Sequence, residues 1–313
     1  MGRGSGAGSS TSRTRRSPRS LLSAQEPSAS ESPGSKSAPS GLTRRALREL
    51  TSRHGIRPDR SLGQHFLADP NLARALAREA GAAPGTRFLE VGAGLGSLTV
   101  ALVAAGAEVL AVEIDRAVVP ALEEVVAGLP VEVVRADAMD ADWPAILGHE
   151  PWRMASNLPY NVAVPVVMGL LERAPGVDPM LVMVQREVGE RLAAGPGEDA
   201  YGAVSLRVAY RAQVHVVRRV PPTVFWPEPQ VESVVVRLSR RPPPVPTPPD
   251  VLFRLIEEGF AQRRKTMANA LVRLGYPRDR ATDGLRRAGL DERVRAEELG
   301  LEDLARLADA LDR

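Results

Sequence analysis

A glycine-rich turn is the most informative local feature of this 313-residue chain. The segment Arg87–Val91 has the apolar pattern of a buried strand, and Gly92, Gly94 and Gly96 follow it. Glycines in such a turn let the backbone approach a bound ligand, because no Cβ atom intervenes. A dinucleotide-binding Gly-x-Gly-x-x-Gly loop would need glycine where this chain has Ser97. The spacing therefore favours a nucleoside-bearing ligand that lacks a pyrophosphate.

Two carboxylates follow the next two predicted strands. Glu113 ends the strand 109–113, where a carboxylate can accept hydrogen bonds from both hydroxyls of a ribose. Asp137 follows the strand 131–135 and can accept a hydrogen bond from an adenine amino group. The carboxyl ends of parallel strands meet at one sheet edge, so the glycines and both acids converge on one crevice. Each feature alone is also compatible with tight packing or a solvated acid, but together they predict an S-adenosylmethionine site.

A fourth predicted strand, 153–156, leads into Asn157-Leu158-Pro159-Tyr160. This turn resembles the Asn/Asp-Pro/Leu-Pro-Tyr/Phe motif of adenine-N6 methyltransferases. The exocyclic adenine amine is a poor nucleophile because its lone pair is delocalised into the ring. The Asn157 side-chain oxygen and the Leu158 carbonyl would accept its two N–H bonds and hold the nitrogen in line with a sulfonium methyl group. Pro159 would fix the backbone and Tyr160 would stack on the base, so no dedicated general base is required.

The elements that must position these residues alternate along the chain from about residue 43. Asp69 and Pro70 supply the N-cap and first-turn proline of a helix. A helix over 97–105 follows the glycines, and further strands are predicted at 180–185 and 231–238. Strands that alternate with helices predict an α/β fold with a doubly wound, mostly parallel sheet.

Composition divides the chain into four parts. Residues 1–42 hold 13 Ser and 6 Gly and almost no large apolar side chains, which predicts a disordered tail. The catalytic domain is expected at 43–240, a semi-rigid hinge with six Pro at 241–250, and a small all-helical domain at 251–313. The tail has the Arg-rich, Ser-rich character of an organelle transit peptide. Because the chain has only two Lys against 39 Arg, an extension in a GC-rich bacterial gene is the favoured interpretation.

Charge and cysteine content exclude several classes of function. The net charge of +3 belongs to the tail, since the residues beyond 42 hold 35 basic and 36 acidic side chains. Nucleic-acid contacts of the folded part must therefore come from local patches. The chain has no cysteine and four scattered histidines, so disulfides are excluded and no metal is expected. No apolar stretch approaches the ~20 residues of a membrane span, which predicts a cytoplasmic protein without membrane contact.

Further motifs extend the resemblance over about residues 55–310. They resemble segments of the ribosomal RNA adenine dimethyltransferase family: Gly63-Gln64-His65-Phe66-Leu67, Gln185–Val188, Phe225–Ser233, and Phe260–Thr266 with Asn269. The resemblance implies a Rossmann-like class I methyltransferase fold, with S-adenosyl-L-methionine as cofactor and S-adenosyl-L-homocysteine as product. It also implies dimethylation of two adjacent adenosines in the 3′-terminal hairpin of 16S rRNA. The expected substrate is the small ribosomal subunit or its precursor, and the expected enzyme is a monomer.

The resemblance also assigns cofactor contacts, to His65, Leu67, Gly92, Glu113, Asp137 and Asn157. Two positions depart from the family pattern, because His65 stands where Asn is usual and Ala93 where Pro is common. If the contact at position 65 runs through the side chain, histidine can still donate or accept through one nitrogen. The tautomer of His65 would then make cofactor binding sensitive to pH.

Two expectations concern RNA. Phe225 would close over the extruded target base opposite Tyr160, although a core aromatic is the alternative interpretation. Arg263, Arg264 and Lys265, expected on a short helix, would contact rRNA phosphates, although a solvated helix face is the alternative. The folded target is expected to be recognised largely by shape.

Three other functions are compatible with parts of the sequence. An Erm-type 23S rRNA methyltransferase of macrolide resistance shares the cofactor loop, but Gln262–Lys265 and Phe225–Ser233 favour the small-subunit enzyme. A non-catalytic small-subunit assembly factor would be favoured by loss of Glu113, Asp137 or Asn157, and all three are present. A DNA adenine methyltransferase is disfavoured because no separate base-reading domain is visible.

Overall fold

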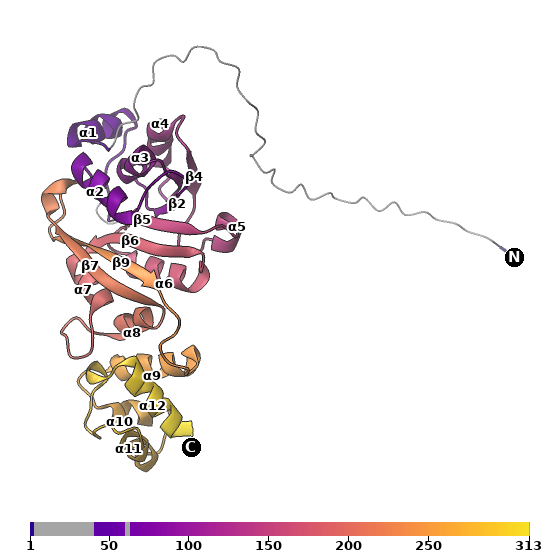
Figure 1. The fold of residues 1–313 in the computed structure, drawn as a ribbon, viewed down its shortest axis with the longest axis vertical. Coiled ribbons are helices and arrows are strands. Elements are labelled where there is room, and N and C mark those ends of the chain that lie inside the picture. Colours follow the sequence, from indigo (N-terminus) through magenta and orange to yellow (C-terminus); the bar gives the residue numbers. More distant parts are fainter. Residues whose placement is uncertain (3–40, 60–62, 313) are drawn as a thin grey trace. The chain divides into compact units, whose positions relative to one another are not determined.

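The computed structural model of the protein describes residues 1–2, 41–59 and 63–312 (Figure 1). The predicted disordered tail, 1–42, lies outside the described residues except at its two ends. At the second of these ends Leu42 is buried, and it packs in one cluster with Leu47 and Leu50 of α1 (Arg44–Arg53). The folded part therefore begins slightly before residue 43. None of the helices in the described ranges is long and apolar enough to span a membrane.

Seven strands form the central sheet in the order β4-β3-β2-β5-β6-β9-β7. Their bounds are β2 (Arg87–Val91), β3 (Glu108–Glu113), β4 (Val131–Arg135), β5 (Trp152–Asn157), β6 (Val177–Gln185), β7 (Ala212–Val220) and β9 (Ser233–Arg240). The pairs among β4, β3, β2, β5 and β6 are parallel, whereas β9 is antiparallel to both of its neighbours. The predicted doubly wound, mostly parallel sheet is confirmed.

Helices cover both faces of the sheet (Figure 1). They are α2 (Pro70–Ala80), α3 (Ser97–Ala104), α4 (Val119–Val126), α5 (Trp143–Leu147), α6 (Ala163–Arg173), α7 (Arg186–Ala193) and α8 (Ala203–Ala209). Successive residues of a strand point to opposite faces. Accordingly Leu110 and Val112 of β3 belong to the core beneath α5 and α6, whereas Val109 and Ala111 belong to the core beneath α2, α3 and α4.

Two short strands lie outside the main sheet. β1 (Phe66–Leu67) pairs in antiparallel fashion with β8 (Phe225–Trp226), which follows a short 3-10 turn, η2 (Pro222–Val224). The Arg44 side chain fastens this pair to α1 by donating to the carbonyl of Phe225 at 3.0 Å. The pairing brings a segment close to the N-terminus beside the carboxyl ends of the sheet strands.

The C-terminal region is helical, as predicted. It contains α9 (Pro249–Ala261), α10 (Met267–Arg273), α11 (Arg278–Arg287), the 3-10 turn η3 (Ala296–Glu298) and α12 (Leu301–Asp312). Its core also takes in Tyr201 and Tyr210, which flank α8. The Tyr201 hydroxyl donates to the Leu299 carbonyl at 2.8 Å. Residues from Gly41 onward belong to one compact unit, and the boundaries predicted at 240 and 251 stay predictions.

Candidate cofactor and target-base site

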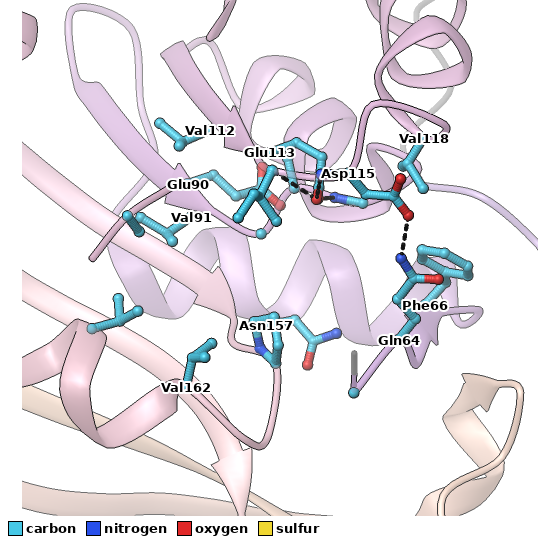
Figure 2. Close-up of a pocket in the computed structure, with 18 of the residues that line it drawn as sticks. Gln64, Phe66, Glu90, Val91, Val112, Glu113, Asp115, Val118, Asn157 and Val162 are labelled. Atoms are coloured by element: carbon cyan, nitrogen blue, oxygen red, sulfur yellow. Dashed lines mark hydrogen bonds between the residues drawn. The ribbon is translucent and has the colours of Figure 1, made fainter. Parts of the chain in front are cut away.

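A pocket of about 210 Å³ lies at the carboxyl ends of β2, β3 and β5 and beside β1 (Figure 2). Its lining includes every residue that the sequence assigned to the cofactor: His65, Leu67, Gly92, Glu113, Asp137 and Asn157. These residues come from segments nearly 100 positions apart, and the parallel sheet brings their strand ends to one edge. The structure thus gathers the predicted site into a single cavity.

The glycine turn is confined on two sides. Gly92 has a φ of 70°, and a Cβ atom built on it would lie 3.0 Å from Cδ of Pro159. A Cβ on Gly94 would lie 3.0 Å from the Phe66 ring of β1. Larger residues would be strained at both positions and would push against these neighbours. The glycines therefore let the turn between β2 and α3 approach both the Asn157–Tyr160 turn and β1.

Glu113 is anchored by the backbone around the glycine turn. One carboxylate oxygen accepts from Gly94 N at 2.8 Å, and the other accepts from Ile114 N at 2.9 Å and Asp115 N at 3.0 Å. Burial raises the pKa of Glu113, whereas these three bonds oppose that rise. A carboxylate offers about four acceptor positions, so one remains free on the oxygen that faces Gly94. In this arrangement Glu113 has room for one further donor rather than for two.

Apolar side chains at the rim of the pocket were missed by the sequence reasoning. Ile114 and Met139 line the pocket with 58% and 38% of their surface exposed. The Asp137 side chain accepts from Met139 N at 2.8 Å and so fixes the second of these residues. Large exposed apolar side chains beside polar groups suit a flat aromatic ligand such as adenine. The sequence does contain a signal for these rim residues: Ile114 directly follows Glu113, and Met139 is two residues after Asp137.

Glu90 is a further carboxyl group in the pocket wall, beside Glu113, Asp115 and Asp137, and no role was predicted for it. It is only 2% exposed and accepts a hydrogen bond from the Thr99 hydroxyl of α3 at 2.7 Å. Burial raises the pKa of Glu90 from 4.5 to about 8, and the neighbouring Glu113 raises it further while the Thr99 bond opposes the rise. Near neutral pH this carboxyl is therefore largely protonated.

The pocket also holds an unpaired polar group that suits a sulfonium nucleoside. Ser97, the first residue of α3, lines the pocket, and its buried hydroxyl oxygen has no hydrogen-bond partner in the described structure. Buried polar atoms are normally paired, so this hydroxyl is a candidate contact for a polar group of the ligand. Among the described residues, no group of three or more His, Asp or Glu side chains could hold a metal ion.

The Asn157–Tyr160 turn is held by hydrogen bonds at both ends. The Asn157 side-chain amide donates to the His65 carbonyl at 2.9 Å, which leaves its oxygen for another partner. Leu158 N donates to the carbonyl of Met183 in β6 at 3.0 Å, and the Leu158 side chain is buried. The Tyr160 hydroxyl bonds Ser233 Oγ at 2.7 Å, and burial raises the pKa of Tyr160.

Phe225 does not lie where the sequence reasoning placed it. Its side chain is fully buried in the core beneath α2 and α3, and it does not line the pocket. Its position is fixed by β1, where Leu67 is its partner across the two strands. The prediction that Phe225 closes over the target base is wrong for this structure, and the alternative of a core aromatic is correct. The ring stacked on Tyr160 is instead that of His65, at 5.3 Å between centroids.

The basic cluster lies in the turn between α9 and α10, so its placement on a short helix was wrong. Arg263, Arg264 and Lys265 are all exposed. Arg263 forms an ion pair with Glu297 at 3.4 Å. In the part of the chain that the structure describes, neither Arg264 nor Lys265 has an ion-pair partner. Two cations are thus available to an anionic partner.

The sheet order with its single antiparallel strand, the glycine turn and the acids at successive strand ends define a class I S-adenosylmethionine-dependent methyltransferase. Solved structures agree with this class. The 23S rRNA methyltransferase ErmE is 27% identical with a TM-score of 0.62, and the match covers 79% of this chain and 100% of that one. A dimethyladenosine transferase from Plasmodium falciparum shares the fold with a TM-score of 0.65 at 24% identity, covering 78% of this chain and 96% of that one.

Sequence comparisons define the family. The model of the family described as ribosomal RNA adenine dimethylase matches residues 56–313. Two curated relatives named ribosomal RNA small subunit methyltransferase A, from Kineococcus radiotolerans and Thermobifida fusca, are each 44% identical to this chain. The first match covers 85% of this chain and 90% of the relative, and the second covers 86% and 95%. The chain belongs to the ribosomal RNA adenine dimethylase family, whose cofactor is S-adenosylmethionine and whose substrate is rRNA.

Proposed function

We propose that the protein dimethylates the N6 atoms of two adjacent adenosines in the 3′-terminal hairpin of 16S rRNA. The observation that carries this proposal is the Asn157 side chain, which lines the cofactor pocket and whose amide nitrogen is engaged by the His65 carbonyl. Its oxygen is thereby left to accept a hydrogen from an amine. The 44% identity to small-subunit methyltransferases over most of the chain supports the choice of RNA.

The residues that would hold the cofactor are the six assigned from the sequence, with His65 contributing its backbone because its ring is engaged by Pro227 and Tyr160. Glu113 would accept from a ribose hydroxyl, and Ile114 and Met139 would flank the adenine. Gly92 would allow the methionine portion to pass close to the backbone. When bound, S-adenosylmethionine supplies an electrophilic methyl group on a sulfonium, and S-adenosylhomocysteine is the product.

Asn157 and Leu158 would orient the target amine. In the first transfer the Asn157 oxygen and the Leu158 carbonyl would accept the two N6 hydrogens, which directs the nitrogen lone pair at the methyl group. As the N–C bond forms, the bond between the methyl carbon and the sulfonium breaks, and N6 releases one proton to water. In the second transfer one of the two acceptors would hold the hydrogen that remains. Leu158 N is bonded to Met183 and the Pro159 ring abuts Gly92, so the turn keeps this geometry without rearrangement. Tyr160 would stack on the base and keep it out of the RNA helix.

The exposed Arg264 and Lys265 would contact phosphates of the rRNA. Their turn is separate from the pocket, and a local cationic patch is required because the chain beyond residue 42 is slightly acidic. We further propose that the enzyme acts as a monomer, on the small subunit or its precursor, in the cytoplasm.

A methylation assay with labelled S-adenosylmethionine tests the proposal. The protein is incubated separately with unmodified small-subunit particles and with large-subunit RNA, and methylated adenines are then mapped. We expect label on two adjacent adenosines of the small-subunit RNA. Label on large-subunit RNA alone would establish the Erm-type activity, and label on neither would favour a non-catalytic assembly factor.

A substitution links that activity to the site. Asn157→Ala removes one of the two acceptors, and we expect the rate of methyl transfer to fall about 100- to 1,000-fold, as for other preorganised transition-state contacts. Binding to small-subunit particles should be nearly unchanged. Asn71→Ala, at the exposed start of α2, is the matched control and should behave as the wild type.

A further inference from the structure

His65 connects three segments of the site through three different groups. Its backbone carbonyl accepts the Asn157 amide at 2.9 Å. Its ring nitrogen Nδ1 lies 2.7 Å from the carbonyl oxygen of Pro227. Its ring face stacks on Tyr160, with 5.3 Å between centroids and 30° between planes. Only the first of these contacts is available to every residue type at position 65.

Both rings of the stacked pair are held at their edges. The Pro227 oxygen can only accept, so Nδ1 of His65 must carry the proton that is donated to it. The Tyr160 hydroxyl is bonded to Ser233 Oγ at 2.7 Å. The two rings lie 95 positions apart in the sequence, and each is held by its own hydrogen bond. The stacked pair is therefore a fixed support for a ligand and not a movable lid.

The spacing of the two rings excludes a base between them. Carbon atoms in contact are about 3.5–4.0 Å apart, so an inserted base would require about 7 Å between the rings. The observed centroid distance is 5.3 Å. A base that stacks on Tyr160 must therefore use the face of that ring which His65 does not cover.

We propose that His65 is a positioning residue that supports Tyr160 from behind and reserves the opposite face of Tyr160 for the target adenine. The inference rests on the proposed function, because it concerns the base that the enzyme methylates. It assigns to the His65 ring a role separate from cofactor contact, while the His65 backbone orients Asn157.

Three variants separate the ring from the backbone. His65→Ala and His65→Asn keep the carbonyl that orients Asn157 but remove the ring, whereas His65→Phe keeps a ring and loses the bond to Pro227. Stacked aromatic pairs stabilise by an amount that corresponds to about 2- to 12-fold in rate or affinity. We expect His65→Ala and His65→Asn to lower kcat/KM for the RNA by that factor. The dissociation constant for S-adenosylmethionine should change less than twofold, and His65→Phe should recover at least half of the loss on a logarithmic scale.

A double-mutant cycle with Tyr160→Ala distinguishes support of Tyr160 from a general structural effect. If His65 acts through Tyr160, removing its ring has no further effect on kcat/KM once Tyr160 is alanine. Additive losses would overturn the proposal. So would a loss confined to S-adenosylmethionine affinity, or full activity in His65→Asn.

The cycle is measured on whichever RNA the wild type methylates, so an error in the proposed substrate does not disturb it. If the wild type methylates neither RNA, the proposed function fails, and the same cycle is read from free energies of unfolding in urea. A coupling between positions 65 and 160 in that measurement would support the stacked pair, and strict additivity would overturn it.

Discussion

Replacement of Glu90 by glutamine should stabilise the protein, and the size of the effect should depend on pH in a defined way. The Glu90 carboxyl is buried in the pocket wall against Thr99, and its pKa in the folded protein is about 8. In the unfolded chain the same group has its ordinary value of 4.5. Glutamine has nearly the same shape, keeps an oxygen that can accept from Thr99, and cannot ionise.

The sign and magnitude follow from proton linkage. Below pH 4.5 the carboxyl is protonated in both states, and its ionisation costs the folded protein nothing. Between pH 4.5 and 8 the unfolded state releases its proton while the folded state retains it, so stability falls by ~1.4 kcal/mol per pH unit. At pH 7, about 2.5 pH units above the unfolded pKa, the accumulated loss is about 3 kcal/mol. Above pH 8 the loss stops growing.

Urea unfolding of cofactor-free protein between pH 5 and pH 9 measures the difference. We expect Glu90→Gln to exceed the wild type by less than 1 kcal/mol at pH 5 and by about 3 kcal/mol at pH 7, with unchanged dependence on urea. Glu123→Gln, on the exposed side of α4, is the control and should show no such trend. A difference that is constant with pH, or a destabilised glutamine variant at pH 8, would refute the reasoning.

Three further substitutions test other parts of the structure. Gly92→Ala places a Cβ 3.0 Å from the Pro159 ring at a φ of 70°. We expect calorimetry to show weaker S-adenosylmethionine binding and methyl-transfer kinetics to show a kcat/KM at least tenfold lower. The control Gly195→Ala, where a Cβ would meet open space, should match the wild type. Arg240→Ala leaves four carbonyls around the end of α6 without the guanidinium that donates to all of them. We expect the free energy of unfolding in urea to fall by about 2–4 kcal/mol. A smaller loss would mean that water replaces the guanidinium. Arg264→Glu should raise KM for small-subunit particles. It should also make the slope of log binding constant against log salt concentration shallower by about one, the amount that one phosphate contact contributes. An unchanged slope would show that this turn does not contact the RNA.

Strands with buried faces on both sides were predictable from local sequence. The strand at 87–91 matches its predicted range and the predicted 109–113 falls within β3, because continuous apolar runs are typical of the interior of a parallel sheet. The edge strand β4 also matches its predicted range, 131–135, although its side chains are only partly buried or exposed. β7 was missed because most of its side chains are exposed at the sheet edge, so its sequence lacks an apolar signal. β1 and β8 were missed because each is two residues long and exists only through pairing with the other.

The candidate site was predictable to the extent that it follows from strand ends. Glu113, Asp137 and Asn157 each lie at or just after the end of a parallel strand, so sheet topology alone brings them together. Phe225 was misplaced because the choice between two adjacent aromatics depends on register. The pairing of Leu67 with Phe225 turns that ring into the core, and no local pattern around Phe225 contains this information. The stacking of His65 on Tyr160 likewise depends on packing between distant segments.

The shared core of the helical region has a consequence for how the target adenosine is selected. Tyr201 and Tyr210 are buried together with residues of α9 and α12, and Arg211 lies 4.8 Å from the Phe253 ring centroid of α9. The turn that carries Arg264 and the turn that carries Asn157 therefore belong to one continuously packed body. We expect such a body to hold the basic turn and the Asn157 turn at a fixed distance from each other. Once the basic turn is seated on the RNA, only nucleotides at a suitable distance from that anchor reach Asn157, so adenosines elsewhere in the RNA are passed over although their chemistry is identical.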